Sequence, residues 1–113
     1  MRQMIVHQGQ VWARHVEYAE SWRERMCGLL GRSTLGDDAA MVIRGCGAVH
    51  TVGMKFAIDV VFVDKAGRIV KITENVRPGC FCVWGGRHAA HVVESEASKL
   101  NLSKLSIGDT LEM

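Results

Sequence analysis

The chain lacks the features of a nucleic-acid-binding or membrane-spanning protein. Its 14 lysines and arginines stand against 12 acidic residues, and a formal net charge of +2 leaves no extended basic face to neutralise phosphates. No apolar run approaches the roughly 18 to 20 residues that span a bilayer. The N-terminal run Met4-Ile5-Val6 is shorter than the apolar region of a signal peptide. We therefore expect a soluble cytoplasmic protein with no membrane span and no nucleic-acid partner.

Proline and linker sequences are also scarce. Pro78 is the only proline, and no repeat, low-complexity tract or Gly/Ser-rich linker divides the chain. With 113 residues, 48% of them hydrophobic, the chain has the usual size of one domain and enough apolar content for one core. We expect a single domain over residues 1–113. Such a core does not need disulfides, so the four cysteines are expected to be reduced.

Short segments rich in β-branched and aromatic residues predict strands along most of the chain. Segment 58–63, Ile-Asp-Val-Val-Phe-Val, is apolar on both faces and predicts a central strand that is covered on both sides. Turn sequences at Gln8-Gly9-Gln10 and Asp64-Lys65-Ala66-Gly67 each predict a hairpin. The other strand candidates are residues 4–7, 11–18, 40–43, 48–52, 68–73, 81–84, 91–94 and a last strand ending at Met113.

Two short helices are predicted beside these strands. Ser21-Trp22-Arg23-Glu24 is a capping box, in which Ser21 and Glu24 each hydrogen-bond the other's backbone. This helix would end near Gly31, pack an apolar stripe of Trp22, Met26 and Leu29 or Leu30, and turn Arg23, Arg25 and Arg32 to solvent. A second helix is expected over residues 96–102, capped by Ser95. Together the elements predict a mainly β fold, a compact single-domain β-sandwich or partly open barrel with one or two short helices.

Four segments carry a family resemblance: RERMCGLLGR at 23–32, HTVGMKFAIDVVFVDKAGRIVKI at 50–72, HVVE at 91–94 and SIGDTL at 106–111. Over about residues 10–113, the chain resembles the domain of unknown function 192 family, an uncharacterised conserved protein family. The resemblance implies a compact, mainly β domain and no established activity. The chain departs from the family pattern at Gly53, Ala57 and Lys104, where many members have tryptophan, proline and glycine.

Polar side chains in and near segment 50–64 are the candidate ligand-binding residues: His50, Thr51, Lys55, Asp59 and Glu94. One hypothesis is a polar pocket that binds an anionic or polar ligand or performs acid–base chemistry. The alternative is structural: Asp59 accepts backbone amides to fix a corner, while His50 and Lys55 are solvated. In an extended strand, Lys55 and Asp59 would lie about 13 Å apart at roughly 3.3 Å per residue, so pairing them requires a bend near Phe56.

Cys80-x-Cys82 followed by His88-x-x-His91 is the nearest pattern to a metal site. Cysteines two positions apart in a strand share a face and could both bind zinc. Structural zinc sites usually have wider spacing, however, and the two histidines would face opposite ways in an extended segment. Ordinary thiols are therefore the default interpretation, and we expect no metal and no cofactor.

Two further sites can be assembled from spacing alone. Gly85-Gly86-Arg87 could hold an anion through backbone amides, although a hairpin connection that needs positive φ explains the glycines more simply. A nucleophile with its base could combine Cys46 or Cys80, His50 or His91, and Asp59, but no local signature supports it.

The sequence leaves three functional hypotheses open. The leading one is a small β-rich accessory or ligand-binding module without catalysis, with an unknown small molecule or protein as partner, acting as a monomer or weak homodimer. The second is a small hydrolytic or metal-dependent enzyme that uses His50, Lys55 and Asp59. The third is a protein-interaction domain that offers an exposed strand edge.

Overall fold

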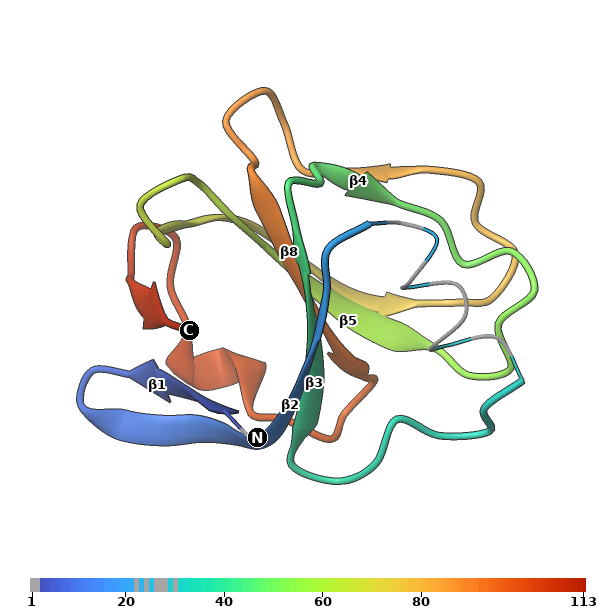
Figure 1. Cartoon of the computed structure of the whole chain (residues 1–113), viewed down its shortest axis with the longest axis horizontal. Coiled ribbons are helices and arrows are strands. Elements are labelled where there is room, and N and C mark those ends of the chain that lie inside the picture. Colours follow the sequence, from blue (N-terminus) through green and yellow to red (C-terminus); the bar gives the residue numbers. More distant parts are fainter. Residues whose placement is uncertain (1–2, 22, 24, 26–28, 30) are drawn as a thin grey trace.

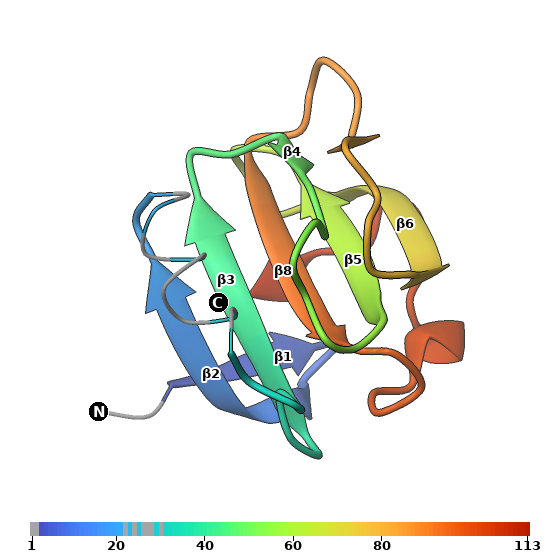
Figure 2. The same ribbon diagram turned by 90° about the vertical axis from the view of Figure 1, so that its right-hand side faces the viewer.

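The protein is a mainly β domain built on one curled sheet. The computed structural model describes residues 3–21, 23, 25, 29 and 31–113. Seven strands form a half-barrel in the order β6-β5-β8-β3-β2-β1-β9, and β4 and β7 form a separate two-stranded sheet (Figures 1 and 2). The strands are β1 (Gln3–His7), β2 (Gln10–Ala19), β3 (Ala39–Arg44), β4 (Ala48–Val49), β5 (Ile58–Val63), β6 (Ile69–Val76), β7 (Val83–Trp84), β8 (His91–Glu96) and β9 (Leu111–Glu112), with one 3-10 turn, η1 (Leu102–Lys104). The predicted fold class is confirmed.

Both predicted hairpins are present. β1 and β2 pair antiparallel across a two-residue turn in which Gln8 and Gly9 have φ of 51° and 78°. Positive φ at both positions is what the tightest hairpin turns require. β5 and β6 pair antiparallel around the turn at Asp64 to Gly67. Strand β5 has the predicted bounds, and all six of its residues are buried.

The sheet has a hydrophobic core on each face. Side chains alternate between the two faces along a strand, so β5 contributes Phe62 to one core and Val61 to the other. We call them the Phe62 core, which includes Met41, Ile43, Ile58, Val60, Phe62 and Val92, and the Trp12 core, which includes Ile5, Trp12, Val42, Val61, Val63 and Val93. The prediction that segment 58–63 is covered on both sides is therefore confirmed.

The first predicted helix falls largely outside the described residues. Its capping partner Glu24 and the stripe residues Trp22, Met26 and Leu30 are among those that the structure does not describe. Arg23, Arg25 and Leu29 are helical, and Leu29 is buried in the Phe62 core. The prediction that Arg25 faces solvent is wrong, because only 2% of Arg25 is exposed.

The second predicted helix is wrong. β8 continues to Glu96, because Ser95 and Glu96 pair with Asp59 and Ile58 on β5 and so remain in the sheet. The short helical element that does occur, η1, starts later, where the Asn101 side chain accepts from the backbone N–H of Ser103 at 3.1 Å. No helix within the described residues is long and apolar enough to cross a bilayer.

The strands predicted at 48–52 and 81–84 are shorter than expected. β4 covers only Ala48–Val49 and β7 only Val83–Trp84. Thr51 leaves the ladder, and its backbone N–H donates to the carbonyl of Cys80 at 2.8 Å. The residues after β4 thereby become a loop that lies over the Phe62 core, and this loop carries most of the candidate site.

Gly85 lies where no side chain can fit. A Cβ atom there would be 2.2 Å from Cδ1 of Phe62 and 2.8 Å from Cβ of Ala89. The neighbouring Gly86 has φ of 95° and nothing within 4 Å of a Cβ position. The need for positive φ therefore applies to Gly86, while Gly85 is required for close packing.

Replacing Gly85 with alanine should lower the free energy of unfolding by about 3 kcal/mol, because the Phe62 ring or the backbone must move. Urea unfolding followed by circular dichroism measures the change. Gly86→Ala is the matched control, since its cost of about 1 kcal/mol reports the left-handed backbone alone. A Gly85→Ala variant as stable as Gly86→Ala would contradict the packing argument.

The β5–β6 turn is held by a carboxylate. Oδ1 of Asp64 accepts from the backbone N–H groups of Ala66 and Arg68, each at 2.9 Å. These bonds, that from Arg68 above all, lower the pKa of Asp64 below its ordinary value. The ionised carboxylate therefore stabilises the folded state.

The Asp64→Asn variant should be less stable than wild type at neutral pH, and this difference in stability should shrink as the solution becomes acidic. Because the pKa of Asp64 is lower in the folded than in the unfolded chain, the stabilisation is present above the ordinary pKa and is lost as the pH falls through the folded-state pKa. Thermal unfolding of both proteins between neutral and strongly acidic pH measures this difference. A difference in stability that stays constant into acid would refute the role of the charge.

Candidate functional site

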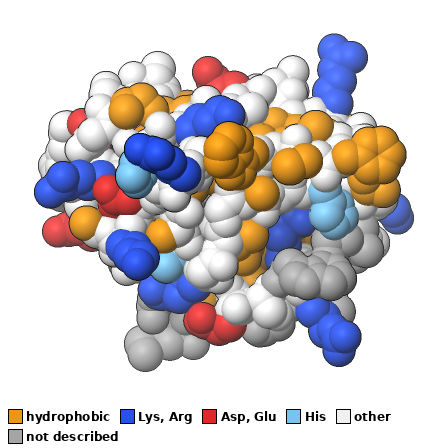
Figure 3. Space-filling model, turned by 90° about the horizontal axis from the view of Figure 1, so that it is seen from above, with side chains coloured by type: hydrophobic (Ala, Val, Ile, Leu, Met, Phe, Trp, Pro, Cys, Tyr) orange, Lys and Arg blue, Asp and Glu red, His pale blue; other side chains and the backbone are white. Residues whose placement is uncertain are grey.

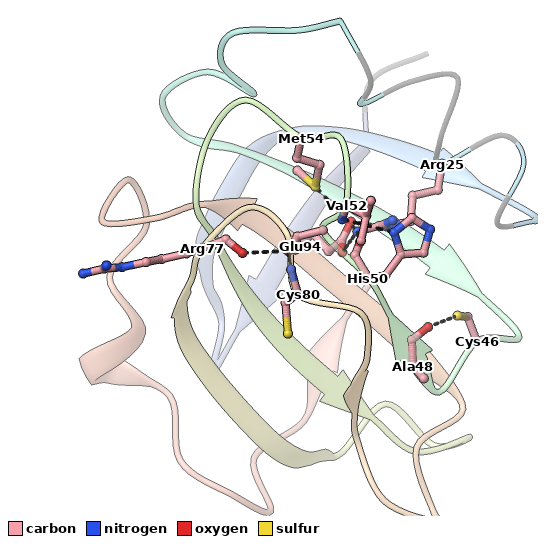
Figure 4. Close-up of polar contacts among 10 residues, drawn as sticks. Arg25, Cys46, Ala48, His50, Val52, Met54, Arg77, Cys80 and Glu94 are labelled. Atoms are coloured by element: carbon pink, nitrogen blue, oxygen red, sulfur yellow. Dashed lines mark hydrogen bonds and ion pairs between the residues drawn. The ribbon is translucent and has the colours of Figure 1, made fainter.

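A buried ion pair lies at the centre of the site. Glu94 on β8 is fully buried in the Phe62 core, between Met41 on β3 and Val60 on β5. Nε of Arg25 donates to Oε1 of Glu94 at 2.8 Å, and Nη2 donates to Oε2 at 2.7 Å. This is the bidentate geometry in which arginine binds a carboxylate most strongly. Figure 4 shows the two side chains meeting beneath the loop that follows β4.

Arg25 also holds the loop that follows β4. Its Nη2 donates to the carbonyl oxygen of His50 at 2.8 Å and lies 3.9 Å from Sδ of Met54 (Figure 4). One guanidinium therefore connects β8 to both ends of segment 50–54. Burial raises the pKa of Glu94, and the hydrogen bonds from Arg25 oppose that rise.

A cavity of about 430 Å³ opens above this pair. Its lining consists of Arg25, Cys46, Ala48, Val49, His50, Phe81 and Cys82. Phe81 forms an outer wall and is 86% exposed, which is unusual for an aromatic side chain. Figure 3 views the side of the molecule that carries β4 and shows hydrophobic side chains at the surface there. A concave, mainly apolar space with a few polar groups is the usual form of a small-molecule site.

The polar groups of the cavity are an imidazole and two thiols. Nδ1 of His50 accepts from the backbone N–H of Val52 at 3.3 Å, so the neutral ring carries its proton on Nε2. The thiol of Cys46 donates to the carbonyl oxygen of Ala48 at 2.8 Å, and Cys82 is exposed. The Nε2–H group of His50, a residue that lines the cavity, is therefore a candidate donor to a ligand.

Thr51 has a structural position beside the cavity. Its buried hydroxyl donates to the carbonyl oxygen of Arg77 at 2.7 Å and accepts from the backbone N–H of Cys80 at 2.9 Å. Its backbone carbonyl also accepts from Gly79 at 3.0 Å. Thr51 thus fastens segment 77–80 to the loop that follows β4, and this segment leads directly into the Phe81 wall.

Asp59 lies on the opposite face of the sheet from Glu94. It stands beside Ser95 on β8, one residue along from Glu94, and neighbouring residues of a strand point to opposite faces. Its carboxylate is 3% exposed and accepts from the backbone N–H groups of Asn75 at 2.8 Å and Ser98 at 3.2 Å. Both of these residues have positive φ, so Asp59 holds two strained corners.

The structure therefore separates the five candidate residues. His50 and Glu94 are brought together through Arg25, and Thr51 supports the adjoining wall. Lys55 is exposed, and Asp59 serves the backbone on the other face. This arrangement matches the structural alternative for Asp59.

The cysteine and histidine pattern is dispersed. Sγ of Cys80 lies 3.8 Å from the carbonyl oxygen of Cys82, and Nδ1 of His91 accepts from the backbone N–H of Gly45 at 3.0 Å. His88 is exposed. Among the described residues, no group of three or more His, Cys, Asp or Glu side chains could hold a metal ion.

Two residues that shape the site, Arg25 and Phe81, are not among the site residues predicted from the sequence. Arg25 was assigned to a solvated basic group, of which Arg23 is indeed exposed and Arg32 pairs with Glu17 at 2.8 Å. Its position three residues after Trp22 and four before Leu29 places it on the predicted apolar stripe. That spacing could have indicated a buried arginine. No signal in the sequence distinguishes Phe81 from a core residue.

A protein-family model described as DUF192, "Uncharacterized ACR", matches residues 4–113. The family resemblance drawn from the four sequence segments is therefore confirmed, over nearly the whole chain. Comparison with curated proteins gives no match.

Two solved structures share the fold. A protein of unknown function from Novosphingobium aromaticivorans DSM 12444, at 1.22 Å resolution, superposes with a TM-score of 0.79 at 19% identity, covering 97% of this chain and 82% of that one. A "putative transcription regulator" from Sinorhizobium meliloti 1021, at 1.55 Å resolution, has a TM-score of 0.78 at 24% identity, covering 96% of this chain and 89% of that one. At these identities the similarity shows the fold alone.

Glu94→Gln should lower the free energy of unfolding by about 3 to 5 kcal/mol, because it leaves the buried charge of Arg25 without its counter-charge. Chemical denaturation measures the loss. The double variant Arg25→Met/Glu94→Leu is the control, and it should be more stable than Glu94→Gln because it buries no charge. A Glu94→Gln protein within about 1 kcal/mol of wild type would contradict the importance of the ion pair.

Proposed function

Because the chain belongs to the uncharacterised DUF192 family, we propose its function from the site itself: it is a binding module for a small, uncharged, mainly apolar molecule. The observation that carries the proposal is the cavity of about 430 Å³ that is lined by Arg25, the partner of Glu94, and by the exposed Phe81. Small-molecule sites usually have volumes of about 300 to 1,000 Å³, so the cavity has a suitable size.

The charges at the base of the cavity favour an uncharged ligand. The positive charge of Arg25 is already balanced by Glu94 at 2.7 Å. An anionic ligand would have to compete with a buried carboxylate that makes two hydrogen bonds to the same guanidinium. The structure thus gives less support to an anionic ligand at this point than the sequence analysis allowed.

The walls favour a ligand with an aromatic or aliphatic body and one acceptor. Burying the exposed ring of Phe81 against an apolar group contributes about 25 cal/mol per Å² of apolar surface removed from water. A flat ring could also stack on Phe81. The Nε2–H group of His50 then supplies one directed hydrogen bond, which would fix the orientation of the ligand.

Binding has more support than the enzyme hypothesis built on His50, Lys55 and Asp59. Acid–base chemistry by these residues would need their side chains to face one space. Asp59 lies on the other face of the sheet, and the carboxylate of Glu94 is occupied by Arg25. The His50, Lys55 and Asp59 combination considered for an enzyme is therefore not assembled.

The neutral fluorophore N-phenyl-1-naphthylamine serves as the test ligand. We expect saturable binding with one site per chain, and Phe81→Ala should weaken it about tenfold, equivalent to about 1.4 kcal/mol of aromatic contact. Its negatively charged relative 8-anilinonaphthalene-1-sulfonate should bind more weakly, because Arg25, the cation among the described lining residues, is already paired with Glu94.

Trp84→Ala is the matched control, since Trp84 is also an exposed aromatic but lines a different cavity. It should leave the affinity unchanged, and neither substitution should lower the thermal unfolding temperature, because both side chains are exposed. Absence of saturable binding to wild type, or equal loss of affinity in the two variants, would overturn the proposal.

A further inference from the structure

Strand β6 forms one edge of the seven-stranded sheet. The strand order ends with β6, which pairs with β5 on one side only. The register with β5 shifts between Ile69 and Lys71 and again between Thr73 and Val76. The backbone of Ile69 also bonds Asp109 and Gly108, so residues 71–73 are the regular stretch that can accept a neighbour. An edge of this kind presents unpaired N–H and C=O groups to any extended chain that approaches.

A second cavity, of about 660 Å³, runs along this edge. On one side it is lined by Lys71, Thr73 and Val76 of β6. On the other side it is lined by Cys80, Val83 and Trp84, of which the last two form β7. The cavity thus lies between β6 and the segment that leads into β7, and Figure 2 shows β6 and the 77–84 segment beside one another.

Lys71 indicates the position of this gap. Its Nζ donates to the carbonyl oxygen of Trp84 at 2.7 Å, so one lysine side chain extends from β6 to β7. Lys71 is the cross-strand partner of Phe62, so its side chain points to the Phe62 face of β6. The gap therefore lies between this face of β6 and β7.

We propose that an extended peptide of a partner protein pairs with the open edge of β6, so that its side chains on the Phe62 face enter this gap. The far wall is fixed before binding, because Thr51 fastens segment 77–80 through Arg77, Gly79 and Cys80. A preformed wall reduces the ordering cost of binding. The regular stretch of β6 accommodates about three peptide residues, roughly 10 Å at 3.4 Å per residue.

The side chains around the gap define the chemistry of the peptide. Lys71 and Arg77 take part in none of the ion pairs among the described residues. A peptide carboxylate can therefore draw the ammonium of Lys71 from the Trp84 carbonyl and free that carbonyl for a peptide N–H group. Trp84 is 59% exposed and offers its ring to an apolar side chain.

Thr73 adds an independent observation. Its Oγ1 is buried and has no hydrogen-bond partner among the described residues, although Thr73 lines the gap. Buried hydroxyls are normally satisfied, and a peptide backbone beside β6 would supply the missing partner. The preferred peptide therefore alternates acidic and apolar residues, as extended peptides do when one face contacts a wall and the other the rim.

A phage-displayed library of random twelve-residue peptides, panned on the folded wild-type chain, provides the probe. We expect enrichment of acidic–apolar sequences, whose synthetic forms bind saturably in fluorescence anisotropy. Trp84→Ala and Lys71→Glu should each weaken binding at least about tenfold. Phe81→Ala, in the other cavity, is the control and should leave the affinity unchanged. Backbone pairing should also slow amide hydrogen exchange within residues 71–73.

Three outcomes would overturn the proposal. They are the absence of any enriched peptide, binding that is insensitive to Trp84→Ala and Lys71→Glu, and binding that leaves amide exchange in β6 unchanged. Concentration-dependent dimerisation of the chain that is lost in Lys71→Glu would assign the edge to a second copy instead. Because the two cavities are tested by different aromatic substitutions, failure here is independent of ligand binding beside Phe81.

Discussion

The bidentate pair between Arg25 and Glu94 is the interaction on which the described site depends. It joins the segment between β2 and β3 to strand β8. Through the carbonyl of His50, it also joins that segment to the loop after β4. Taking both ions out of water costs several kcal/mol each, and apolar residues of similar volume would stabilise a core equally well or better. The pair is thus better understood as a device that positions His50 and Met54 than as a source of net stability.

The alternation of side chains in the sheet decides which polar groups can act together. Glu94 and Asp59 lie on neighbouring strands and within one position of one another in register, yet they face different cores. On the Phe62 side, the carboxylate of Glu94 binds the guanidinium of Arg25. On the Trp12 side, the carboxylate of Asp59 accepts from two backbone amides at left-handed corners. Chemically similar residues therefore have separate tasks, one at the base of a cavity and the other in holding the ends of strands.

Sequence patterns predicted the elements whose structure depends mainly on neighbouring residues. The run at 58–63 is apolar at every position but one, and this pattern could be read directly as a strand buried on both faces. The predicted helix at 96–102 failed because the capping signal of Ser95 competes with long-range pairing of Ser95 and Glu96 to β5, and the pairing prevails. The propensity of a local segment does not reflect pairing with a strand more than thirty residues away in the sequence.

The candidate site was harder to predict for the same reason. The burial of Arg25 requires a partner 69 residues away in the chain, and a single sequence does not show which carboxylate that is. Gly85 presents the same difficulty, since its requirement arises from the ring of Phe62 and not from its own backbone. His50, Thr51 and Glu94 could be singled out because polar residues in apolar segments are unusual, but their division of roles depends on the three-dimensional register.

The two cavities are linked by a common wall. Segment 77–84 separates them, Cys82 lines both, and Phe81 and Trp84 each project into one. Thr51 fastens the start of this wall and β4 pairs with its end. A ligand beside Phe81 and a strand beside Trp84 would therefore contact opposite sides of one short, anchored segment. Because that segment contains only two residues that pair in a sheet, its position depends on Thr51 more than on sheet pairing. The geometry of both cavities therefore depends on the side chain of Thr51, which lines neither of them.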